Sequence, residues 1–397
     1  MSQNALFSVS SMQHVSFVWS EMYKDSKRSK RDGYGLDGIS INQFKADETA
    51  SIKHLSRNIR NNTYKPQNLS PYFIPKPDGK DRVICVPAVV DRLVQRAVLN
   101  FLHSNGYGFE NSISYGFVQN QSVPKAAKRA IELRSALPWV YKADITAFFD
   151  TVDRNKLLNK VRRKIRVSSL HSLLELFVRS EIHHRNISSK KRVKKMGIRS
   201  GVGLRQGMPV SPYLANIYLN KFDKEIEKLN IPMVRYADDI IAFASSEEEC
   251  IRIHTICSEL LAREGLQIHP IDEGKKTVIA SPEEDVEFLG LGLKFKDNDY
   301  TLVVTEEQLN SIQNKVLEMS SMEYCLKNGI SLSGLMRKLD DRINGYYGAY
   351  GICSNKEQLA HALNSVKSKS ITRLLTDEFN IDYRGLTNKQ KRFLQIE

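Results

Sequence analysis

The stretch RYADDI, residues 235–240, places two adjacent aspartates between apolar neighbours. Residues 232–244 otherwise have the composition of a strand, the two aspartates and a second strand. Asp238 and Asp239 repel each other when both are ionised, and burying either one without a partner costs free energy. A hairpin turn with both side chains in water is one interpretation of the pair. A bound cation is the other, and the surrounding sequence bears on the choice.

A third carboxylate stands at the end of another apolar run, in ADITAFFDTVD at residues 143–153. Residues 139–145 are predicted to form a strand, which places Asp144 at its end. Asp144 could instead cap the helix that follows it. Helix capping is the main role that we assign to Asp150 and Asp153.

One aspartate at a strand end and two in a later hairpin suit a hard divalent cation. Mg²⁺ takes oxygen ligands, keeps several waters and commonly binds through one or two carboxylates plus substrate phosphates. The cation would let Asp238 and Asp239 remain ionised side by side. Two such ions, about 3.5–4 Å apart, can stabilise the attacking and leaving oxygens of a phosphoryl displacement. The nine histidines show no metal-ligand spacing, so only carboxylates are predicted to bind the metal.

Charge and cysteine content limit the class of protein. The chain has 397 residues, with 59 Lys and Arg against 45 Asp and Glu, a net charge of +14. This excess favours a polyanionic partner such as nucleic acid, although a merely basic protein has the same totals. The five cysteines include no CxxC pair, which argues against a zinc site and a secreted disulfide scaffold. We find no signal peptide and no apolar run of membrane-spanning length, which predicts a cytoplasmic protein with no membrane partner.

Hydrophobic periodicity predicts a mixed α/β order of elements followed by a helical end. The expected elements are helices at 47–62, 89–102 and 212–230, a hairpin at 72–87, and short strands at 277–280 and 286–295. The segment 154–199 is strongly basic, and its second part, 185–199, is expected to be a loop or ribbon. From Thr305 onward the pattern is helical, which places a domain boundary near residue 300.

Nine blocks of sequence resemble the bacterial reverse transcriptases of the group II intron-like and retron-type superfamily. In order, the blocks are LDGIS, IPKPDGKDRVICVP, DRLVQRAV, SYGF, ADITAFFDTVD, LRQGMPVSPYLANIYL, RYADDIIAF, DEGKKTVIA and EFLGLGL. A single YADD is a weak signal, whereas nine blocks in the family's order are specific. The resemblance implies an α+β right-hand polymerase fold. Its parts would be an N-terminal extension and fingers at 1–119, a palm at 120–300 with a basic finger insertion at 154–199, and a helical thumb at 301–397.

The resemblance also implies the residues of the site. Asp144, Asp238 and Asp239 would be the catalytic and metal-binding carboxylates, with two Mg²⁺ ions for which Mn²⁺ could substitute. The residues expected to bind the nucleotide are Lys76, Arg82, Phe149, Gln206, Gly207 and Lys275. The residues expected to bind primer or template are Tyr236, Phe288, Leu289 and Gly290. Phe149 would act as a steric gate against the ribose 2′-OH, although core packing is the ordinary role of a phenylalanine.

The activity implied is RNA-directed DNA polymerase, which would extend a DNA or RNA primer with dNTPs. The block QGMPVSP is intact, and we find neither the VTG and NAxxH blocks of retron enzymes nor an HNH-type block. The chain is therefore most similar to stand-alone reverse transcriptases of antiphage defence, whose partner is a structured non-coding RNA. Two alternatives remain open, an RNA-binding maturation factor with a non-essential polymerase site and an untemplated or protein-primed polymerase. The template, the primer and the oligomeric state are not predicted.

Overall fold

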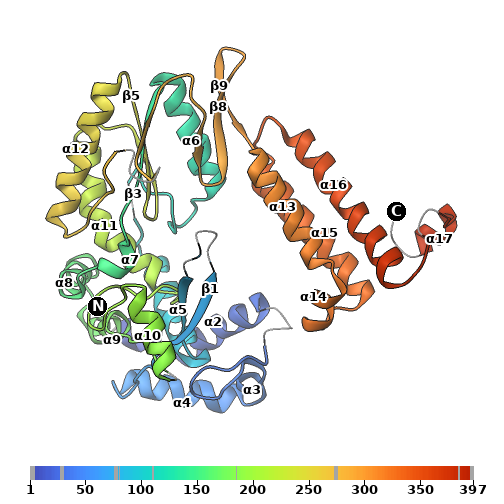
Figure 1. Cartoon of the computed structure of the whole chain (residues 1–397). Helices are drawn as coiled ribbons and strands as arrows, with labels where there is room; N and C mark the ends of the chain where they lie inside the picture. Colours follow the sequence, from blue (N-terminus) through green and yellow to red (C-terminus); the bar gives the residue numbers. More distant parts are fainter. Residues whose placement is uncertain are drawn as a thin grey trace. The chain divides into compact units, whose positions relative to one another are not determined.

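The computed structural model describes residues 5–26, 31–75, 79, 81–109, 111–184, 186–271, 276–382 and 385–393 (Figure 1). The chain forms two compact units that alternate along the sequence. Unit 1 comprises Met1–Gln121, Lys142–Ala242 and Ile251–Val278, and unit 2 comprises Ser122–Tyr141, Phe243–Cys250 and Ile279–Glu397. These units divide the chain differently from the fingers, palm and thumb boundaries, which remain a prediction about functional parts.

Unit 1 begins with helices and a hairpin. These elements are α1 (Ala5–Val9), α2 (Met12–Asp25), α3 (Ile41–Ala46), α4 (Glu48–Arg60), β1 (Ser70–Pro75), β2 (Asp81–Val86) and α5 (Val89–Ser104). The strands β1 and β2 pair antiparallel, from Ser70 opposite Val86 to Pro75 opposite Asp81. The hairpin expected at 72–87 and the helices expected at 47–62 and 89–102 are therefore present.

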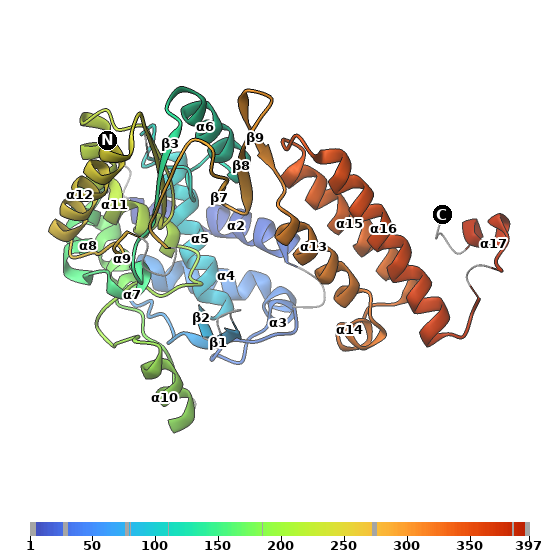
Figure 2. The same ribbon diagram turned by 45° about the horizontal axis from the view of Figure 1, so that its top comes forward.

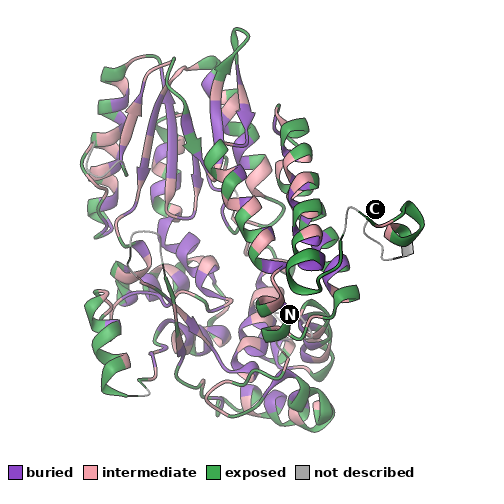
Figure 3. Cartoon of the chain, turned by 45° about the vertical axis from the view of Figure 1, so that its right-hand side comes forward, coloured by how far each residue is buried: buried purple, intermediate pink, exposed green. Residues whose placement is uncertain are grey.

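A four-stranded sheet of order β4-β5-β3-β6 follows. Its strands are β3 (Trp139–Asp144), β4 (Met233–Tyr236), β5 (Asp239–Ala244) and β6 (Val278–Ala280). The residues of β5 after Asp239 are all buried, as Figure 3 shows for the strands of this sheet. The helix α11 (Ser211–Lys228) also has a largely buried apolar face, as its spacing predicts.

Several helices and a 3₁₀ turn lie between residues 148 and 263. They are α7 (Phe148–Thr151), α8 (Arg154–Lys164), η2 (Ser168–Leu170), α9 (His171–Val178), α10 (Ile187–Lys195) and α12 (Glu247–Arg263). The expectation of a loop or ribbon over 185–199 is wrong, because α10 occupies most of it. Asn186 caps this helix by accepting a hydrogen bond from Ser189 N at 2.8 Å, and Lys and Arg are good helix formers.

Unit 2 contains α6 (Val123–Ala136) and an antiparallel sheet of order β7-β8-β9. The strands are β7 (Val286–Phe288), β8 (Leu291–Lys296) and β9 (Asp299–Val303). The segment 286–295, expected as one strand, is a hairpin because Leu289 and Gly290 both have positive φ, 56° and 76°. Arg134 of α6 is fully buried and donates to Leu293 O at 2.7 Å and Glu284 O at 2.6 Å.

The C-terminal part of unit 2, from Glu306 onward, is helical, as its periodicity predicts. Its helices are α13 (Glu306–Met319), α14 (Met322–Lys327), α15 (Leu332–Tyr350), α16 (Lys356–Arg373), η4 (Leu374–Glu378) and α17 (Asn388–Phe393). Val316, Leu335, Leu339 and Val366 form the centre of their core. Across the described ranges, no helix is long and apolar enough to cross a membrane. All five cysteines are buried free thiols.

Candidate active site

The two adjacent aspartates lie in the tight turn between β4 and β5. Tyr236 is paired with Asp239, which leaves Ala237 and Asp238 as the two turn residues. Ala237 has φ 59°, whereas Asp238 is not among the residues with positive φ, a sign pattern that matches a type II′ turn. Glycine is the usual residue at that first turn position, so Ala237 stores about 1–3 kcal/mol of backbone strain. Strain of this kind persists only where the surroundings fix the conformation.

Asp144 lies at the same end of the sheet as this turn. The strand β3, which ends at Asp144, is the neighbour of β5, which begins at Asp239. The next residue, Ile145, donates its N–H to Asp238 O at 3.2 Å. Asp144, Asp238 and Asp239 are each only partly buried. The structure therefore brings together the three carboxylates that the sequence singled out.

The electrostatics of the turn favour a cation. Burial raises the pKa of Asp239, the negative charge of Asp238 raises it further, and Lys142 opposes the shift. Carboxylate oxygens are the donors that Mg²⁺ prefers, so the donor set fits this ion. In the part of the chain that the structure describes, no three His, Cys, Asp or Glu side chains form a ready metal-binding group. The side chains would have to converge further to coordinate an ion together.

A buried ion pair between β4 and α11 stabilises the turn. Arg235 is fully buried and donates from Nε and Nη2 to Asp223, at 2.7 and 2.6 Å. Its Nη1 donates to Ala237 O at 2.8 Å, which holds the strained turn residue directly. A bidentate pair of this kind is among the stronger and more directional side-chain contacts. Arg235 thus couples β4 and α11 to the position of Asp238.

A second contact fixes the turn through a neighbouring segment. A Cβ added to Gly116 would lie 2.4 Å from Ala237 N, so only glycine fits this close approach. Gly116 O in turn accepts a hydrogen bond from Asn216 Nδ2 at 2.9 Å. Phe117 follows with φ 58° and a 53% exposed side chain, and its ring lies 6.1 Å from that of Tyr236. Tyr236 is partly exposed beside it and remains a predicted primer-binding residue.

The expected nucleotide-binding residues of unit 1 are joined by backbone contacts. Phe149 is partly exposed, unlike the buried Phe148 beside it, and Phe149 O accepts from Leu204 N at 2.6 Å. Two residues later, Gln206 O accepts from Cys85 N of β2 at 2.7 Å. The block containing Gln206 therefore links the segment after Asp144 to the β1–β2 hairpin.

Gly207 approaches Ile84 and Cys85 of β2, the strand that carries Arg82. A Cβ on Gly207 would lie 2.8 Å from Ile84 Cγ2 and from Cys85 O, so a larger residue would separate the two segments. Arg82 lies two residues before Ile84, on the same face of β2, because side chains alternate along a strand. The exposed Arg82 side chain is therefore on the side of the hairpin that faces Gln206 and Gly207, the glutamine–glycine block.

A cavity of about 390 Å³ opens beside Gly207. Arg92 and Arg96 line it, and Arg96 pairs with Asp25 at 3.3 Å. Arg92 Nε is buried and has no hydrogen-bond partner among the described residues. Burial lowers the pKa of Arg92, and the charge of Arg96 lowers it further. The cavity therefore carries positive charge that its walls do not fully neutralise, which suits a phosphate group.

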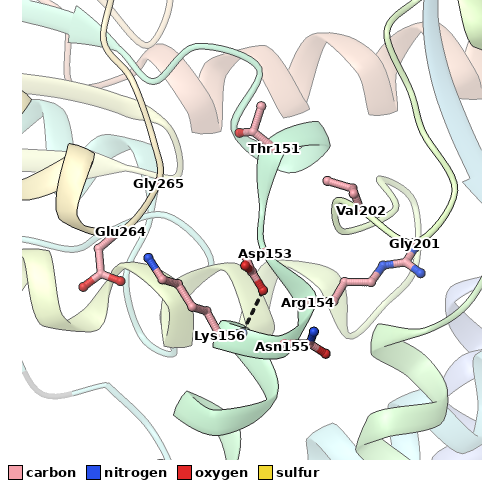
Figure 4. Close-up of a pocket in the computed structure, with 9 residues that line it drawn as sticks. All are labelled: Thr151, Asp153, Arg154, Asn155, Lys156, Gly201, Val202, Glu264 and Gly265. Atoms are coloured by element: carbon pink, nitrogen blue, oxygen red, sulfur yellow. Dashed lines mark hydrogen bonds between the residues drawn. The ribbon is translucent and has the colours of Figure 1, made fainter.

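A separate cavity of about 370 Å³ lies at the start of α8 (Figure 4). Its lining comes from residues 151, 153–156, 201–202 and 264–265. Asp153 caps α8 here by accepting from Lys156 N at 2.9 Å, the role that the sequence assigned to it. None of the predicted site residues lines this cavity.

The other predicted residues are either outside the described residues or belong to unit 2. Lys76 and Lys275 lie outside the described residues. Phe288, on β7 of unit 2, is fully buried. Leu289 and Gly290 form the partly exposed turn after it, and they remain predicted primer-binding residues.

Sequence reasoning missed the residues that support the turn. Arg235, Asp223 and Asn216 were not predicted to have any role in the site. A signal was present at Arg235, since an arginine inside an apolar strand has to find a buried partner. Gly116 and Phe117 belong to the block SYGF, which was noticed without roles for its residues.

Comparisons with known proteins identify the family. A family model described as reverse transcriptase (RNA-dependent DNA polymerase) matches residues 74–293, more than half of the chain. This chain belongs to the reverse transcriptase family. The α+β fold implied by the nine blocks is thereby confirmed.

Three curated relatives show the breadth of the similarity. Protein YkfC of Escherichia coli K12 is 29% identical over 200 residues, which cover 49% of this chain and 50% of YkfC. Group II intron-encoded protein LtrA of Lactococcus lactis is 25% identical over 252 residues, covering 59% of this chain and 40% of LtrA. Retron Ec83 reverse transcriptase of Escherichia coli is 25% identical over 186 residues, which cover 45% of this chain and 54% of that enzyme. The chain thus spans about half the length of these relatives.

Proposed function

We propose that this protein is an RNA-directed DNA polymerase that synthesises cDNA by two-metal nucleotidyl transfer. The observation that carries the proposal is the contact between Ile145 N and Asp238 O. It places Asp144 at the same sheet end as Asp238 and Asp239, five residues before the Phe149 that contacts the glutamine–glycine block. Carboxylates for metal ions and a pocket for a nucleotide are the two parts that this reaction needs.

Each residue has a defined role in this proposal. Asp144 and Asp238 are the main metal ligands, and Asp239 completes the set. Bound Mg²⁺ would supply Lewis-acid stabilisation of the attacking and leaving oxygens. Arg82 neutralises charge on the incoming triphosphate, and the ring of Phe149 excludes a ribose 2′-OH.

The experiment that tests the proposal is sequencing of the RNA and DNA that co-purify with the protein from its own cells. The test variant is Asp238→Asn/Asp239→Asn. A matched control is available in Asp340→Asn/Asp341→Asn, because this second aspartate pair lies at the exposed surface of α15, where Asp340 pairs with Lys367 at 2.6 Å. DNA complementary to a bound RNA is expected with the wild type and the control and not with the test variant. The same RNA in all three samples without DNA would favour an RNA-binding maturation factor instead.

We also propose that the RNA partner is a structured non-coding RNA and that the system acts in antiphage defence. The net charge of +14 and the Arg92–Arg96 cavity support an RNA partner. The similarity to stand-alone defence enzymes supports the biological role. Protection against phage infection by the wild type and the Asp340/Asp341 control, but not by the Asp238/Asp239 variant, is the expected result. Equal phage susceptibility with and without the intact protein would remove the defence role and leave the polymerase proposal standing.

A further inference from the structure

The helix α10 is attached to the β1–β2 hairpin by one of its residues. Arg192 donates from Nε to Asp81 at 2.6 Å, and its guanidinium lies 4.1 Å from the centre of the Phe73 ring. Val193 is buried beside it. The hydrogen bond from Arg192 lowers the pKa of Asp81, so this pair is ionised at neutral pH. The helix is thus held on the β1–β2 hairpin. On strand β2 of this hairpin, Cys85 contacts Gln206.

The rest of α10 presents positive charge to solvent. Lys190, Lys191 and Lys194 are exposed and have no ion pair among the described residues. Positions 190, 191 and 194 share one face of a helix, because residues three and four apart are neighbours. The three lysines take no part in the contact of Arg192 with Asp81 and Phe73. Figure 2 shows α10 extending away from the neighbouring elements of unit 1.

The surrounding sequence leaves this charge uncompensated. Between Glu181 and Asp223 the chain has no acidic residue, while it has nine Lys and Arg. A run of like charges is often only a solvated surface. Here the run is a capped helix fixed to a hairpin by an ion pair and a stacked ring, which gives the lysines a defined position. A polyanion can therefore meet them without first ordering the segment.

We propose that the lysine face of α10, formed by Lys190, Lys191 and Lys194, binds the phosphodiester backbone of the single-stranded template RNA ahead of the polymerase site. The inference rests on the proposed function, because the β1–β2 hairpin that holds α10 also contacts Gln206, which is predicted to bind the nucleotide, and the template base has to pair with that nucleotide. Lysine contacts to phosphates are independent of base sequence. The face would hold template RNA in register without selecting its sequence.

The test is a salt titration of binding to primer–template duplexes with a long or a one-nucleotide 5′ RNA overhang. The variant is Lys190→Gln/Lys191→Gln/Lys194→Gln, which keeps good helix formers and leaves Arg192 and Val193 in place. The control, Lys53→Gln/Lys65→Gln/Lys224→Gln, removes the same charge from exposed lysines elsewhere in unit 1. Each phosphate contact on a single strand contributes about 0.7 to the slope of log K against log salt concentration.

The expected result is a slope that falls by about 1.4–2.1 for the long overhang, for two or three lost contacts. If binding at 1 M salt is unchanged, the affinity at 0.1 M falls about 25- to 125-fold. No change is expected with the one-nucleotide overhang or with the control variant.

Three results would overturn the inference. They are an unchanged slope, an equal loss with the one-nucleotide overhang, and an equal loss in the control variant. Primer extension by the wild type is measured in parallel. Extension with an unchanged slope removes only the role of α10, whereas a wild type that extends no primer removes the proposed function.

Discussion

Substitutions of Arg235 are expected to show which part of its effect is on the free energy of unfolding and which part is on the position of Asp238. Arg235 and Asp223 are 0% and 1% exposed, and two hydrogen bonds join them. Removing one partner of a buried ion pair costs about 3–5 kcal/mol, because the remaining charge stays buried. That loss is a large share of a typical stability of about 5–15 kcal/mol. Arg235→Met is therefore expected to be severely destabilised.

Arg235→Lys is the more informative change. A lysine keeps the positive charge near Asp223 but cannot make the bidentate contact and the bond to Ala237 O together. Loss of hydrogen bonds to a charged group costs about 1.5–3 kcal/mol, so most molecules remain folded. The turn that carries Asp238 loses its fixed position. A misplacement of about 1 Å can reduce a rate about 100-fold, and we expect kcat to fall by that order with little change in KM.

The assay combines urea unfolding with steady-state primer extension, corrected for the folded fraction. Leu174→Ala is the matched control, because Leu174 is fully buried on α9 and leucine-to-alanine changes cost about 2–5 kcal/mol. Its kcat per folded molecule is expected to equal that of the wild type. Wild-type kcat in Arg235→Lys, or an equal loss of kcat in both variants, would refute a positioning role for Arg235.

Four further predictions follow from the site and its surroundings. Phe149→Ala should lower the ratio of kcat/KM for dNTPs to that for rNTPs, and an unchanged ratio would contradict the gate assignment. Gly116→Ala should reduce kcat sharply, because the added Cβ would lie 2.4 Å from Ala237 N and would displace the turn. An unchanged kcat would show that the turn tolerates this displacement. Burial raises the pKa of Asp239, so protons compete with metal as pH falls toward that pKa, and the Mg²⁺ concentration for half-maximal activity should rise at acidic pH. A value that does not change with pH would contradict this reading. Burial raises the pKa of Asp91 to about 6, so the folded state binds this proton more tightly than the unfolded state, whose pKa is about 3.9. Its stabilising contribution is complete at low pH and is lost as pH rises from about 4 to about 6, by about 3 kcal/mol in total. Urea unfolding of Asp91→Asn across this range should lack that dependence, and an identical pH profile in both proteins would exclude Asp91 as its source.

The placement of the three aspartates was accessible from the sequence because local patterns determine it. Apolar runs predicted the strand that ends at Asp144 and the two strands around Asp238 and Asp239, and the structure contains all three. The resemblance of the blocks then implied that the three aspartates belong to one site. The contact between Ile145 and Asp238 is the observation that the prediction required.

The support of the turn could not be predicted, because it depends on contacts between distant segments. Arg235 finds Asp223 on α11 and Ala237 beside it, whereas Gly116 approaches from more than 100 residues earlier in the chain. Periodicity reports which face of an element is buried and says nothing about its partner. The positive φ of Ala237 is equally invisible, because tertiary contacts override the preference of alanine.

The helix α10 shows a different limit of sequence reasoning. Its run of lysines was interpreted as a loop because few apolar positions mark a buried face. The deciding residues were Asn186, which caps it, and Arg192 with Val193, which attach it to the hairpin. A short basic helix held by one ion pair and one buried side chain leaves almost no hydrophobic period to detect.

The most direct test of the central claim is deoxynucleotide incorporation by the purified protein on a defined RNA template with an annealed primer and Mg²⁺. Extension products complementary to the template are predicted for the wild type and for Asp340→Asn/Asp341→Asn. No product is predicted for Asp238→Asn/Asp239→Asn, although it should bind the same RNA and unfold at a similar urea concentration. Equal extension by the wild type and the Asp238/Asp239 variant would contradict the assignment of these carboxylates as the catalytic centre.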